Sequence, residues 1–406
     1  MHILFLTENF PPERYAIASR VYERACYWIR WGHKVTVLTC VPNFPEGKIY
    51  KGYHNKWYQV EYMDGIRVVR TKTFITPNEG FYLRTLDFMS YMVTAFFAGL
   101  FQKGPDVIVA TSPQFFAAVG GWALAKVRYV PFILELSDLW PASITAVGLM
   151  NDNVIIRWIE KFELFLYCQA ASIVVLTESF KENLISRGIR ESKISVILNG
   201  VDISRYEPRP RDDSLSEQLG LKGCFVVGYI GTLGMAHALE NVLNSAENLR
   251  DFQNIRFLFV GTGAARRALI EETNRRKLKN VVFVPSQPKA RISAYWSICD
   301  VSLIHLKNTP LFKTVIPSKI FESMGVGLPL LLAAPKGEAS KIVEEENTGM
   351  WVPPENPEAL SDAIIILKKD KERLRQFAVH SRKASSSYSR KSQAKNMLAV
   401  LERVIT

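Results

Sequence analysis

The sequence predicts an α/β protein with two doubly wound domains in tandem. This prediction depends on the length of 406 residues, on the alternation of short apolar runs with helical patterns, and on one polar interruption near mid-chain. A chain of this length exceeds one ordinary core, so two domains of about 150–200 residues are expected. Near-continuous apolar strands alternating with helices are typical of parallel sheets covered on both faces.

The first half of the chain supplies the elements of the first domain. Its strands are short aliphatic runs bounded by turn residues, and its helices repeat apolar residues at helical spacing. A loop rich in Pro, Asn, Gly and Tyr is expected after the second strand. The expected strands are 2–7, 34–39, 66–71, 106–111, 131–136, 172–177 and 194–199, and the longest expected helices are 15–31, 81–103 and 114–128.

Residues 200–224 are polar and rich in Pro, Asp and Ser, which predicts an interdomain linker. The alternation then restarts, an additional strand-like run ends at Pro317, and the tail from 357 to 406 is helical and basic. The expected strands are 224–231, 255–261, 281–284, 300–306, 328–333 and 350–353, with helices at 236–249, 264–277, 289–298, 318–325 and 338–346.

The composition bounds the partners. The 51 Lys and Arg residues exceed the 39 Asp and Glu residues, giving a net charge of +12, which favours a polyanionic partner or an anionic membrane face. Signatures of nucleic-acid-binding domains are absent and the basic residues are dispersed, so no nucleic acid partner is expected, although polyanion binding stays open. Scattered histidines and cysteines, without HExxH or CxxC, predict no metal site.

Two charge-free runs are not expected to cross a membrane. Residues 88–102 are shorter than the roughly 20 residues needed, and residues 107–125 are divided by Ser112-Pro113-Gln114. The N-terminus lacks a signal-peptide pattern. The five scattered cysteines suggest reduced thiols, so a cytoplasmic location is expected. The aromatic residues of helix 81–103 fit either core packing or docking on the inner face of an anionic membrane.

The turns after the strands are the expected places for chemistry, because ligands of doubly wound sheets bind at the carboxyl ends of the strands. Gly231-Thr232-Leu233-Gly234 follows one strand and precedes a helix. Glycines there let the backbone approach a ligand, and the helix N-terminus offers N–H groups to an anion. The alternative is a tight strand–helix connection without a ligand.

The segment VIPSKIFESMGVGLPLLL, residues 315–332, is more specific. Ser318 is expected to cap a helix. Lys319 and Glu322 are three residues apart and share one helix face, which suits a diphosphate at the helix tip and a ribose at the carboxylate. The alternative is an exposed ion pair worth tenths of a kcal/mol. Glu338 begins a later helix, where a carboxylate is ordinarily a dipole partner.

The first domain offers a second group of polar residues. Glu13 ends the turn Asn9-Phe10-Pro11-Pro12-Glu13 after the first strand. Arg20, in the next helix, either points toward a phosphate or is an ordinary solvated arginine. Asp138 follows a strand and Trp140 offers a ring for stacking on a sugar; the alternative for Asp138 is an N-cap or Asx turn.

The order of these motifs resembles the retaining glycosyltransferases of family 4, which have the GT-B fold. The motifs are the PPE turn (11–13), NGVD (199–202), GTLG (231–234), VGTG (260–263), PSKxxExMxxGxP (317–329) and GE…ExxTGxxVPP (337–354). DLWP (138–141) and PNFPEGK (42–48) are similar to a bacterial subgroup that builds O-antigen, capsule and colanic acid, and that includes N-acetyl-L-fucosaminyl transferases.

The resemblance implies two Rossmann-like domains that face a central cleft. Residues 1–200 would bind the acceptor, residues 201–384 the nucleotide sugar, and the helix 385–406 would cross back to the first domain. Glu322 matches the glutamate that accepts from the ribose hydroxyls, Gly231 to Gly234 match the turn that faces the diphosphate, Glu338 lies in the second-domain cleft turn, and Lys319 neutralises phosphate charge.

Three departures from the family pattern concern the donor. Thr314 stands where the first glutamate of the E-x7-E motif is expected, Thr232 and His237 stand at the positions of the arginine and lysine that clamp the diphosphate, and Tyr15 and Ala16 replace paired glycines. We expect Lys319, together with Arg20 or Lys313, to supply the missing charge.

The implied reaction is metal-independent transfer, with retention, of a hexose or N-acetylated amino sugar from a UDP-sugar to a polyprenyl-diphosphate-linked saccharide. No cofactor is expected besides the donor. The alternative on the same fold is a nucleotide-sugar epimerase or hydrolase that uses His237. The expected catalytic residues are Asp138, Lys319 and Glu322, and the expected substrate-binding residues are Glu13, Arg20, Trp140, Gly231, Thr232, Leu233, Gly234, His237, Ser318 and Glu338.

Overall fold

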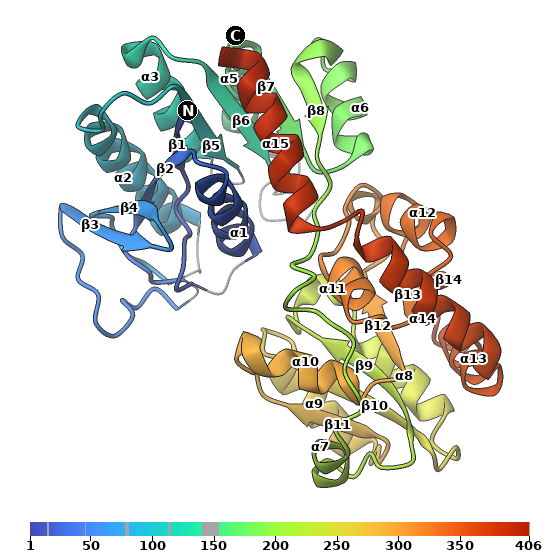
Figure 1. Ribbon diagram of the computed structural model, residues 1–406. Coiled ribbons are helices and arrows are strands. Elements are labelled where there is room, and N and C mark those ends of the chain that lie inside the picture. Colours follow the sequence, from blue (N-terminus) through green and yellow to red (C-terminus); the bar gives the residue numbers. More distant parts are fainter. Residues whose placement is uncertain (14–15, 45, 78–80, 113–114, 140–153, 406) are drawn as a thin grey trace. The chain divides into compact units, whose positions relative to one another are not determined.

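Two separate α/β units make up the chain, which confirms the predicted pair of doubly wound domains (Figure 1). The computed structural model describes residues 1–13, 16–44, 46–77, 81–112, 115–139 and 154–405. Unit 1 comprises Met1–Leu198 and Arg390–Thr406, and unit 2 comprises Asn199–Ser389. The chain therefore crosses between the units twice, after Leu198 and after Ser389.

Unit 1 is built on an eight-stranded sheet of order β3-β4-β2-β1-β5-β6-β7-β8. Its strands are β1 (His2–Leu6), β2 (Lys34–Cys40), β3 (Tyr58–Met63), β4 (Ile66–Thr71), β5 (Val107–Thr111), β6 (Phe132–Leu136), β7 (Ser172–Val175) and β8 (Ile194–Val196). Its helices are α1 (Ala16–Arg30), α2 (Phe81–Leu100), α3 (Phe115–Arg128), α5 (Val154–Gln169), α6 (Glu178–Ser186), the short η1 (Glu191–Lys193) and α15 (Arg390–Ile405).

The prediction of a wholly parallel first sheet is wrong at one edge. Strand β3 lies in the segment expected to be a loop and pairs antiparallel with β4. Asp64 and Gly65 connect the two strands with φ values of +47° and +83°, as a tight hairpin turn requires. Both faces of β3 are at least partly exposed, so the strand lacks the apolar run that marks the other strands.

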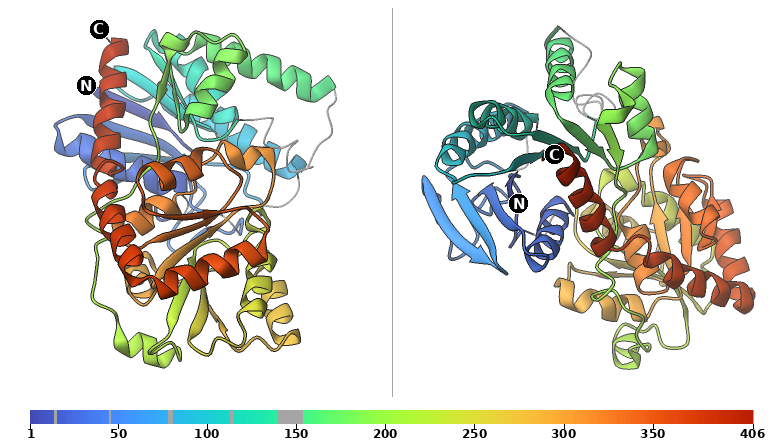
Figure 2. Two further views of the ribbon diagram at one scale, coloured as in Figure 1. Left: turned by 90° about the vertical axis from the view of Figure 1, so that its right-hand side faces the viewer. Right: turned by 45° about the horizontal axis from the view of Figure 1, so that its top comes forward.

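The C-terminal helix α15 lies beside α1 in unit 1 (Figure 2). The indole Nε1 of Trp28 donates to the carbonyl oxygen of Ala394 over 2.9 Å in the buried part of this contact. At the entrance to α15, Arg390 forms an ion pair of 2.7 Å with Glu23. The chain end is thus part of the unit that the N-terminus begins.

Unit 2 contains a six-stranded parallel sheet of order β11-β10-β9-β12-β13-β14. Its strands are β9 (Phe225–Ile230), β10 (Ile255–Val260), β11 (Val281–Val284), β12 (Val301–His305), β13 (Leu330–Ala333) and β14 (Gly349–Val352). Its helices are α7 (Asp213–Gln218), η2 (Met235–His237), α8 (Glu240–Asn248), α9 (Arg266–Arg275), α10 (Lys289–Ser297), η3 (Pro310–Lys313), α11 (Lys319–Gly325), α12 (Glu338–Glu345), α13 (Pro357–Lys369) and α14 (Lys371–Ser385).

Both faces of the second sheet are covered. Phe257 and Phe259 pack on the side of α8 and α13, whereas the alternate residues Leu258 and Val260 pack on the side of α10. The strand order reverses between β9 and β12. In doubly wound sheets, ligands bind beyond the carboxyl ends of the strands at such a reversal.

The predicted linker 200–224 belongs to unit 2 and is not a free connection. It contains α7, which Asp212 caps by accepting a hydrogen bond from the backbone N–H of Leu215. Leu215 and Leu221 are buried in the core on the α10 side of the sheet. The polar composition of this segment reflects its position along the surface of the unit.

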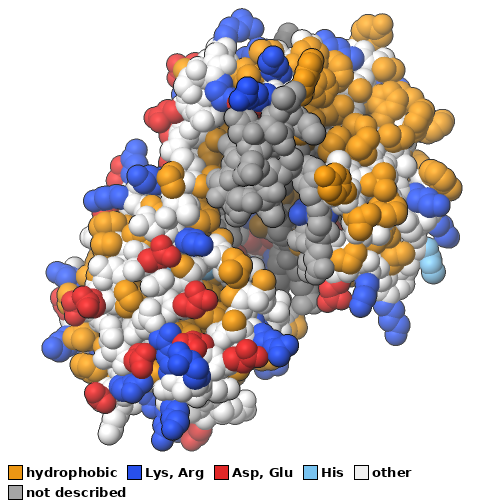
Figure 3. All heavy atoms as spheres, turned by 180° about the vertical axis from the view of Figure 1, so that it is seen from behind, with side chains coloured by type: hydrophobic (Ala, Val, Ile, Leu, Met, Phe, Trp, Pro, Cys, Tyr) orange, Lys and Arg blue, Asp and Glu red, His pale blue; other side chains and the backbone are white. Residues whose placement is uncertain are grey.

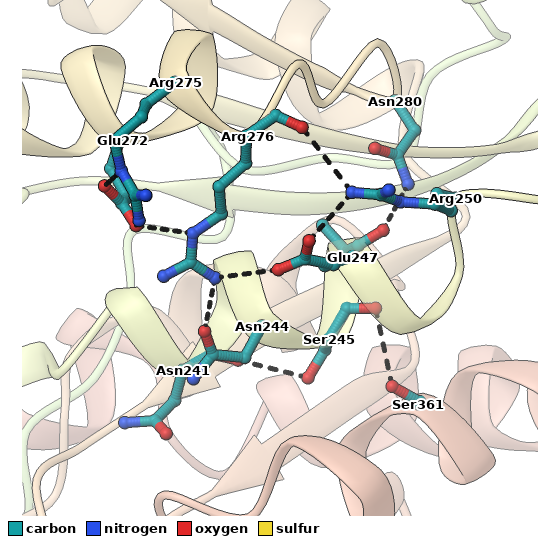
Figure 4. A network of polar contacts seen from close by, with 11 residues as sticks. Asn241, Asn244, Ser245, Glu247, Arg250, Glu272, Arg275, Arg276, Asn280 and Ser361 are labelled. Carbon is teal, nitrogen blue, oxygen red and sulfur yellow. Dashed lines mark hydrogen bonds and ion pairs between the residues drawn. The ribbon is translucent and has the colours of Figure 1, made fainter.

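A polar network joins α8 to α9 (Figure 4). The guanidinium of Arg276 donates to Asn244 over 2.6 Å and forms ion pairs with Glu272 at 2.5 Å and Glu247 at 3.2 Å. Arg250 adds a second ion pair to Glu247 at 2.8 Å. Exposed pairs of this kind contribute little singly, and together they link the two helices at the surface of the unit.

Within the described part of the chain, no helix combines the length and apolarity needed to cross a membrane.

Candidate functional site

Two glycine turns pack backbone against backbone at the carboxyl end of β9 and β10. Gly231 has φ of +141°, and its N–H donates to the carbonyl oxygen of Val260 over 2.9 Å. A Cβ atom on Gly261 would lie 1.9 Å from the carbonyl oxygen of Gly231, and one on Gly263 would lie 2.4 Å from that of Leu233. Gly261 and Gly263 are therefore required by this close approach.

Within the GTLG turn, Leu233 anchors the backbone. Its side chain is fully buried, its N–H donates to Thr262 and its carbonyl oxygen accepts from Ala265. Both backbone polar groups of Leu233 thus already form hydrogen bonds within the protein, and its ligand contact stays a prediction. By contrast, a methyl group on Gly234 would make only ordinary contacts, the nearest at 3.6 Å.

Lys319 lies at the centre of the site and is buried. Its side chain is 8% exposed, and its Nζ lies 3.4 Å from the centroid of the Tyr229 ring. A Cβ atom on Gly231 would approach the Cε atom of Lys319 to 2.7 Å. The missing side chain of Gly231 thus makes room for this lysine. The sequence pattern had assigned that space to a ligand.

The ammonium of Lys319 is a buried charge without a hydrogen-bond partner among the described residues. Burial lowers the pKa of Lys319 from 10.5 to about 7, while the carboxylate of Glu322 acts in the opposite direction. The alternative of an exposed ion pair is therefore wrong. A buried polar group that stays unpaired is costly, so an anionic ligand here would satisfy it.

The expected helix cap at Ser318 is wrong. Ser318 has φ of −59° and ψ of −25° and no side-chain capping bond. Its carbonyl oxygen already accepts from the N–H groups of Phe321 and Glu322, while Pro317 accepts from Ile320. The strand-like run before Pro317 is also wrong, because Val315 and Ile316 lie in the connection that follows η3.

His237 also contacts Tyr229. Its ring is 5.9 Å from the Tyr229 ring, and its Nδ1 is 3.1 Å from the carbonyl oxygen of His305. Because a carbonyl only accepts, Nδ1 carries the proton of the neutral ring. Burial and then the charge of Lys319 lower the pKa of His237 to about 4. Sequence analysis missed Tyr229 and His305, which are strand residues without a motif.

Glu322 and Glu338 are half-buried and belong to different helices. Glu322 is one turn along α11 from Lys319, and Glu338 is the first residue of α12. A Cβ atom on Gly337 would lie 2.1 Å from the carbonyl oxygen of Lys313. The start of α12 therefore packs against the end of η3, where the side chain of Lys313 is exposed.

Thr314, at the position of the first E-x7-E glutamate, ends η3. Its Oγ1 donates to the carbonyl oxygen of Leu311 over 2.8 Å. The side chain thus closes a local turn, and it carries no charge that could replace a carboxylate.

In unit 1, Glu13 ties two loops together. Its buried carboxylate accepts from the backbone N–H groups of Asn43 and Phe44 at 2.8 and 2.9 Å, and from the side chain of Asn9 at 2.9 Å. Burial raises the pKa of Glu13, against the effect of these hydrogen bonds. The geometry gives Glu13 the role of positioning the PNFPEGK loop.

Arg20 belongs to a buried charge cluster, so its interpretation as an ordinary solvated arginine is wrong. Its Nε lies 3.1 Å from Glu135, which also pairs with Arg24 at 2.6 Å, and its guanidinium donates to Ser137. Glu135 is fully buried, and although burial alone would raise its pKa, Arg24 and Arg20 lower it. Arg20 thus shares one counter-charge with Arg24, and its contact with a phosphate stays a prediction.

Asp138 is half-buried and lies two residues beyond the end of β6. This agrees with its expected place at a strand's carboxyl end. Trp140 lies outside the described residues, as does Tyr15. No group of His, Cys, Asp or Glu side chains in the described ranges could hold a metal ion.

The comparisons with known proteins match both halves of the chain. Residues 17–205 match the family described as "Glycosyltransferase Family 4", and residues 212–384 match "Glycosyl transferases group 1". The chain is a GT-B glycosyltransferase with a family 4-type domain and a group 1 domain.

Relatives of this glycosyltransferase include enzymes of surface polysaccharide biosynthesis. The putative colanic acid biosynthesis glycosyl transferase WcaI of Escherichia coli K12 is 25% identical, with 93% of this chain and 95% of that protein covered. The probable glycosyltransferase WbjE of Pseudomonas aeruginosa is 24% identical, over 68% of this chain and 69% of that protein.

Solved structures agree on the fold of the glycosyltransferase. Sucrose-phosphate synthase of Thermosynechococcus elongatus superposes with a TM-score of 0.78 at 18% identity, covering 99% of this chain and 98% of that chain. Anabaena HepE in complex with UDP-glucose superposes with a TM-score of 0.71 at 20% identity, covering 99% and 100%.

Proposed function

We propose that the protein transfers a hexosyl or N-acetylhexosaminyl residue from a UDP-sugar to a polyprenyl-diphosphate-linked saccharide, with retention of configuration, in bacterial surface polysaccharide biosynthesis. The observation that carries the proposal is the buried ammonium of Lys319 at the strand-order reversal of unit 2, without a partner among the described residues. The relationship to WcaI and the UDP-bound HepE structures support the donor and the pathway.

In this reaction the bond between the sugar C1 and the β-phosphate oxygen breaks, and the bond between C1 and the acceptor oxygen forms on the same face. The acceptor proton passes to the leaving phosphate, so no protein nucleophile is needed. Negative charge develops on the diphosphate, where a fixed cation in a dry site is most effective. Lys319 supplies that cation, and the exposed Lys313 can add a second one.

The other residues have supporting roles. Glu322 accepts from the ribose hydroxyls, Glu338 contacts the donor sugar, and the Thr232 and Gly234 turn borders the diphosphate. Asp138 orients the sugar that is transferred or accepted. The lipid-linked acceptor requires the enzyme to work at the cytoplasmic face of the membrane, as a peripheral protein. No metal or cofactor is invoked, because the protein's own charges serve the leaving group.

The epimerase or hydrolase alternative is not favoured. It needs an acid/base group near neutral pKa, and burial lowers the pKa of His237 to about 4. The named relatives are also glycosyltransferases.

The test begins with calorimetric titration of UDP, GDP and dTDP, followed by their sugars with and without lipid extracts as acceptor. We expect UDP to bind best, and the anomeric configuration of the product, read by NMR, to match that of the donor. The Glu322→Gln variant should bind UDP about tenfold or more weakly, through a lost charge-assisted bond, and should no longer distinguish UDP from 2′,3′-dideoxy-UDP. Preference for another nucleotide would refute UDP as the donor nucleotide, and an inverted product would refute transfer with retention.

A further inference from the structure

The solvent side of α2 in unit 1 is apolar along its whole length. Its outward residues follow helical spacing, and each is between 43% and 86% exposed. A surface helix ordinarily presents polar residues to water. The residues of this stripe are Tyr82, Leu86, Met89, Val93 and Phe97, and Phe101 continues it beyond the helix end with 77% exposure.

The stripe continues over neighbouring helices. Phe162 and Phe165 of α5 stack on each other and contact Phe115 and Trp122 of α3 at ring distances of 5.6 and 5.3 Å. Trp158, at the start of this row, is 69% exposed. Helix α3 packs between α2 and α5. On the face drawn in Figure 3, hydrophobic side chains gather over this part of unit 1. We call the exposed side of α2, α3 and α5 the apolar face.

The charges around the apolar face are mainly positive. Lys103, Lys126 and Lys161 are exposed after α2, on α3 and on α5. Among the described side chains of the three helices, Glu160 is the one exposed acid, and it pairs with Arg187 at 3.3 Å. An apolar surface with aromatic residues and a basic border is typical of proteins that lie in the interface of an anionic bilayer.

We propose that the apolar face of α2, α3 and α5 docks into an anionic lipid surface. The inference rests on the proposed function in one respect, since a lipid-linked acceptor requires the enzyme at a membrane. The charge distribution favours this occupant over a second copy of the chain, because a symmetric contact through this face would bring the three lysines of each copy together, in a protein of net charge +12.

The test is flotation of the full chain with vesicles of phosphatidylglycerol and phosphatidylethanolamine, and with neutral phosphatidylcholine vesicles. The double variant Val93→Glu/Phe97→Glu should lower the vesicle partition coefficient about tenfold or more. Its matched control is Val379→Glu, on an exposed position of α14 in unit 2. This control should bind vesicles like the wild type.

A second pair of variants isolates the charge. Lys103→Ala/Lys126→Ala/Lys161→Ala should weaken binding to anionic vesicles about fivefold per lysine at low salt. The control Lys279→Ala/Lys369→Ala/Lys371→Ala removes the same charge from exposed positions of unit 2. It should have a smaller effect.

Equal binding by Val93→Glu/Phe97→Glu and Val379→Glu would overturn the proposal. So would a dimer in sedimentation that the double variant dissociates, because the face would then join two copies. UDP affinity, measured on the same preparations, reports the proposed function alone and should be unchanged in all of these variants.

Discussion

Replacing Lys319 by methionine should stabilise the unliganded protein while weakening its affinity for UDP. The ammonium is buried over the Tyr229 ring without a hydrogen-bond partner among the described residues, so its charge opposes folding. Methionine has a similar length, fills the space beside Gly231 and carries no charge. The same substitution removes the cation that we assign to the diphosphate.

The magnitude follows from the lowered pKa. A fall from 10.5 to about 7 corresponds to roughly 4–5 kcal/mol by linkage, the full penalty being present below pH 7. Between pH 7 and 10.5 the unfolded chain binds the proton and the folded chain does not, so stability rises with pH. The gain between pH 7 and 9 is about 2 kcal/mol. Attraction to Tyr229 offsets part of the penalty, so we expect Lys319→Met to stabilise by about 2–4 kcal/mol at pH 7.

The assay is chemical denaturation at pH 7 and pH 9, with calorimetric titration of UDP at pH 7. The matched control is Lys279→Met, an exposed lysine of unit 2. Lys319→Met should lose the rise in stability with pH and bind UDP roughly thirtyfold or more weakly. A variant with the stability and pH slope of the control would refute the burial argument, and one with normal UDP affinity would refute the role of the charge.

Three further predictions use the same molecule. Binding of UDP between pH 7.5 and 9 should take up as much as one proton, because only charged Lys319 binds the diphosphate. The uptake is measured by calorimetry in buffers of different ionisation enthalpy, and the Kd for UDP should rise about tenfold per pH unit. Binding of UDP without proton uptake would contradict this. Gly231→Ala should destabilise the protein by about 1–3 kcal/mol and weaken UDP binding, because position 231 has a φ of +141° and a Cβ there would approach Lys319. Gly234→Ala should do neither. Equal denaturation midpoints for the two variants would contradict this prediction. Glu135→Gln should lower the free energy of unfolding by about 3–5 kcal/mol, measured by denaturation, because it leaves Arg20 and Arg24 buried without their counter-charge. The control Glu271→Gln, in the exposed pair with Arg267, should lower it little. Similar losses of stability in the two variants would contradict the importance of the buried cluster.

The alternation of apolar runs predicted the sheets well because buried parallel strands need continuous aliphatic residues. Strand β3 escaped because an edge strand exposed on both faces needs no such run, although Asp64-Gly65 was a usable hairpin signal. Helix α7 escaped because a polar segment that lies along a surface has the composition of a linker. The stretch before Pro317 was mistaken for a strand because two apolar residues do not distinguish a strand from a packed connection.

The site was predictable where the chemistry is local and unpredictable where it depends on partners distant in sequence. Lys319 and Glu322 could be paired from their helical spacing, but the burial of Lys319 depends on Tyr229, about 90 residues earlier in the chain. The pairing of Arg20 with Glu135 could not be predicted because Glu135, on β6, carries no motif. The diphosphate contact of Gly231 stays a prediction, and the space that a side chain on Gly231 would occupy is filled by Lys319.

The departures from the family pattern and the burial of Lys319 are physically linked. Each additional cation beside a buried ammonium would lower its pKa further. Thr232 and His237 both contact Tyr229, over which Lys319 is held, so an arginine and a lysine at these positions would start close to it. The charge of Lys319 already helps to keep His237 neutral. A site with uncharged residues at those two positions can therefore retain one buried lysine in its charged form near neutral pH. A single buried cation makes donor binding dependent on pH. A clamp of exposed arginine and lysine would not, because both residues stay charged throughout this range.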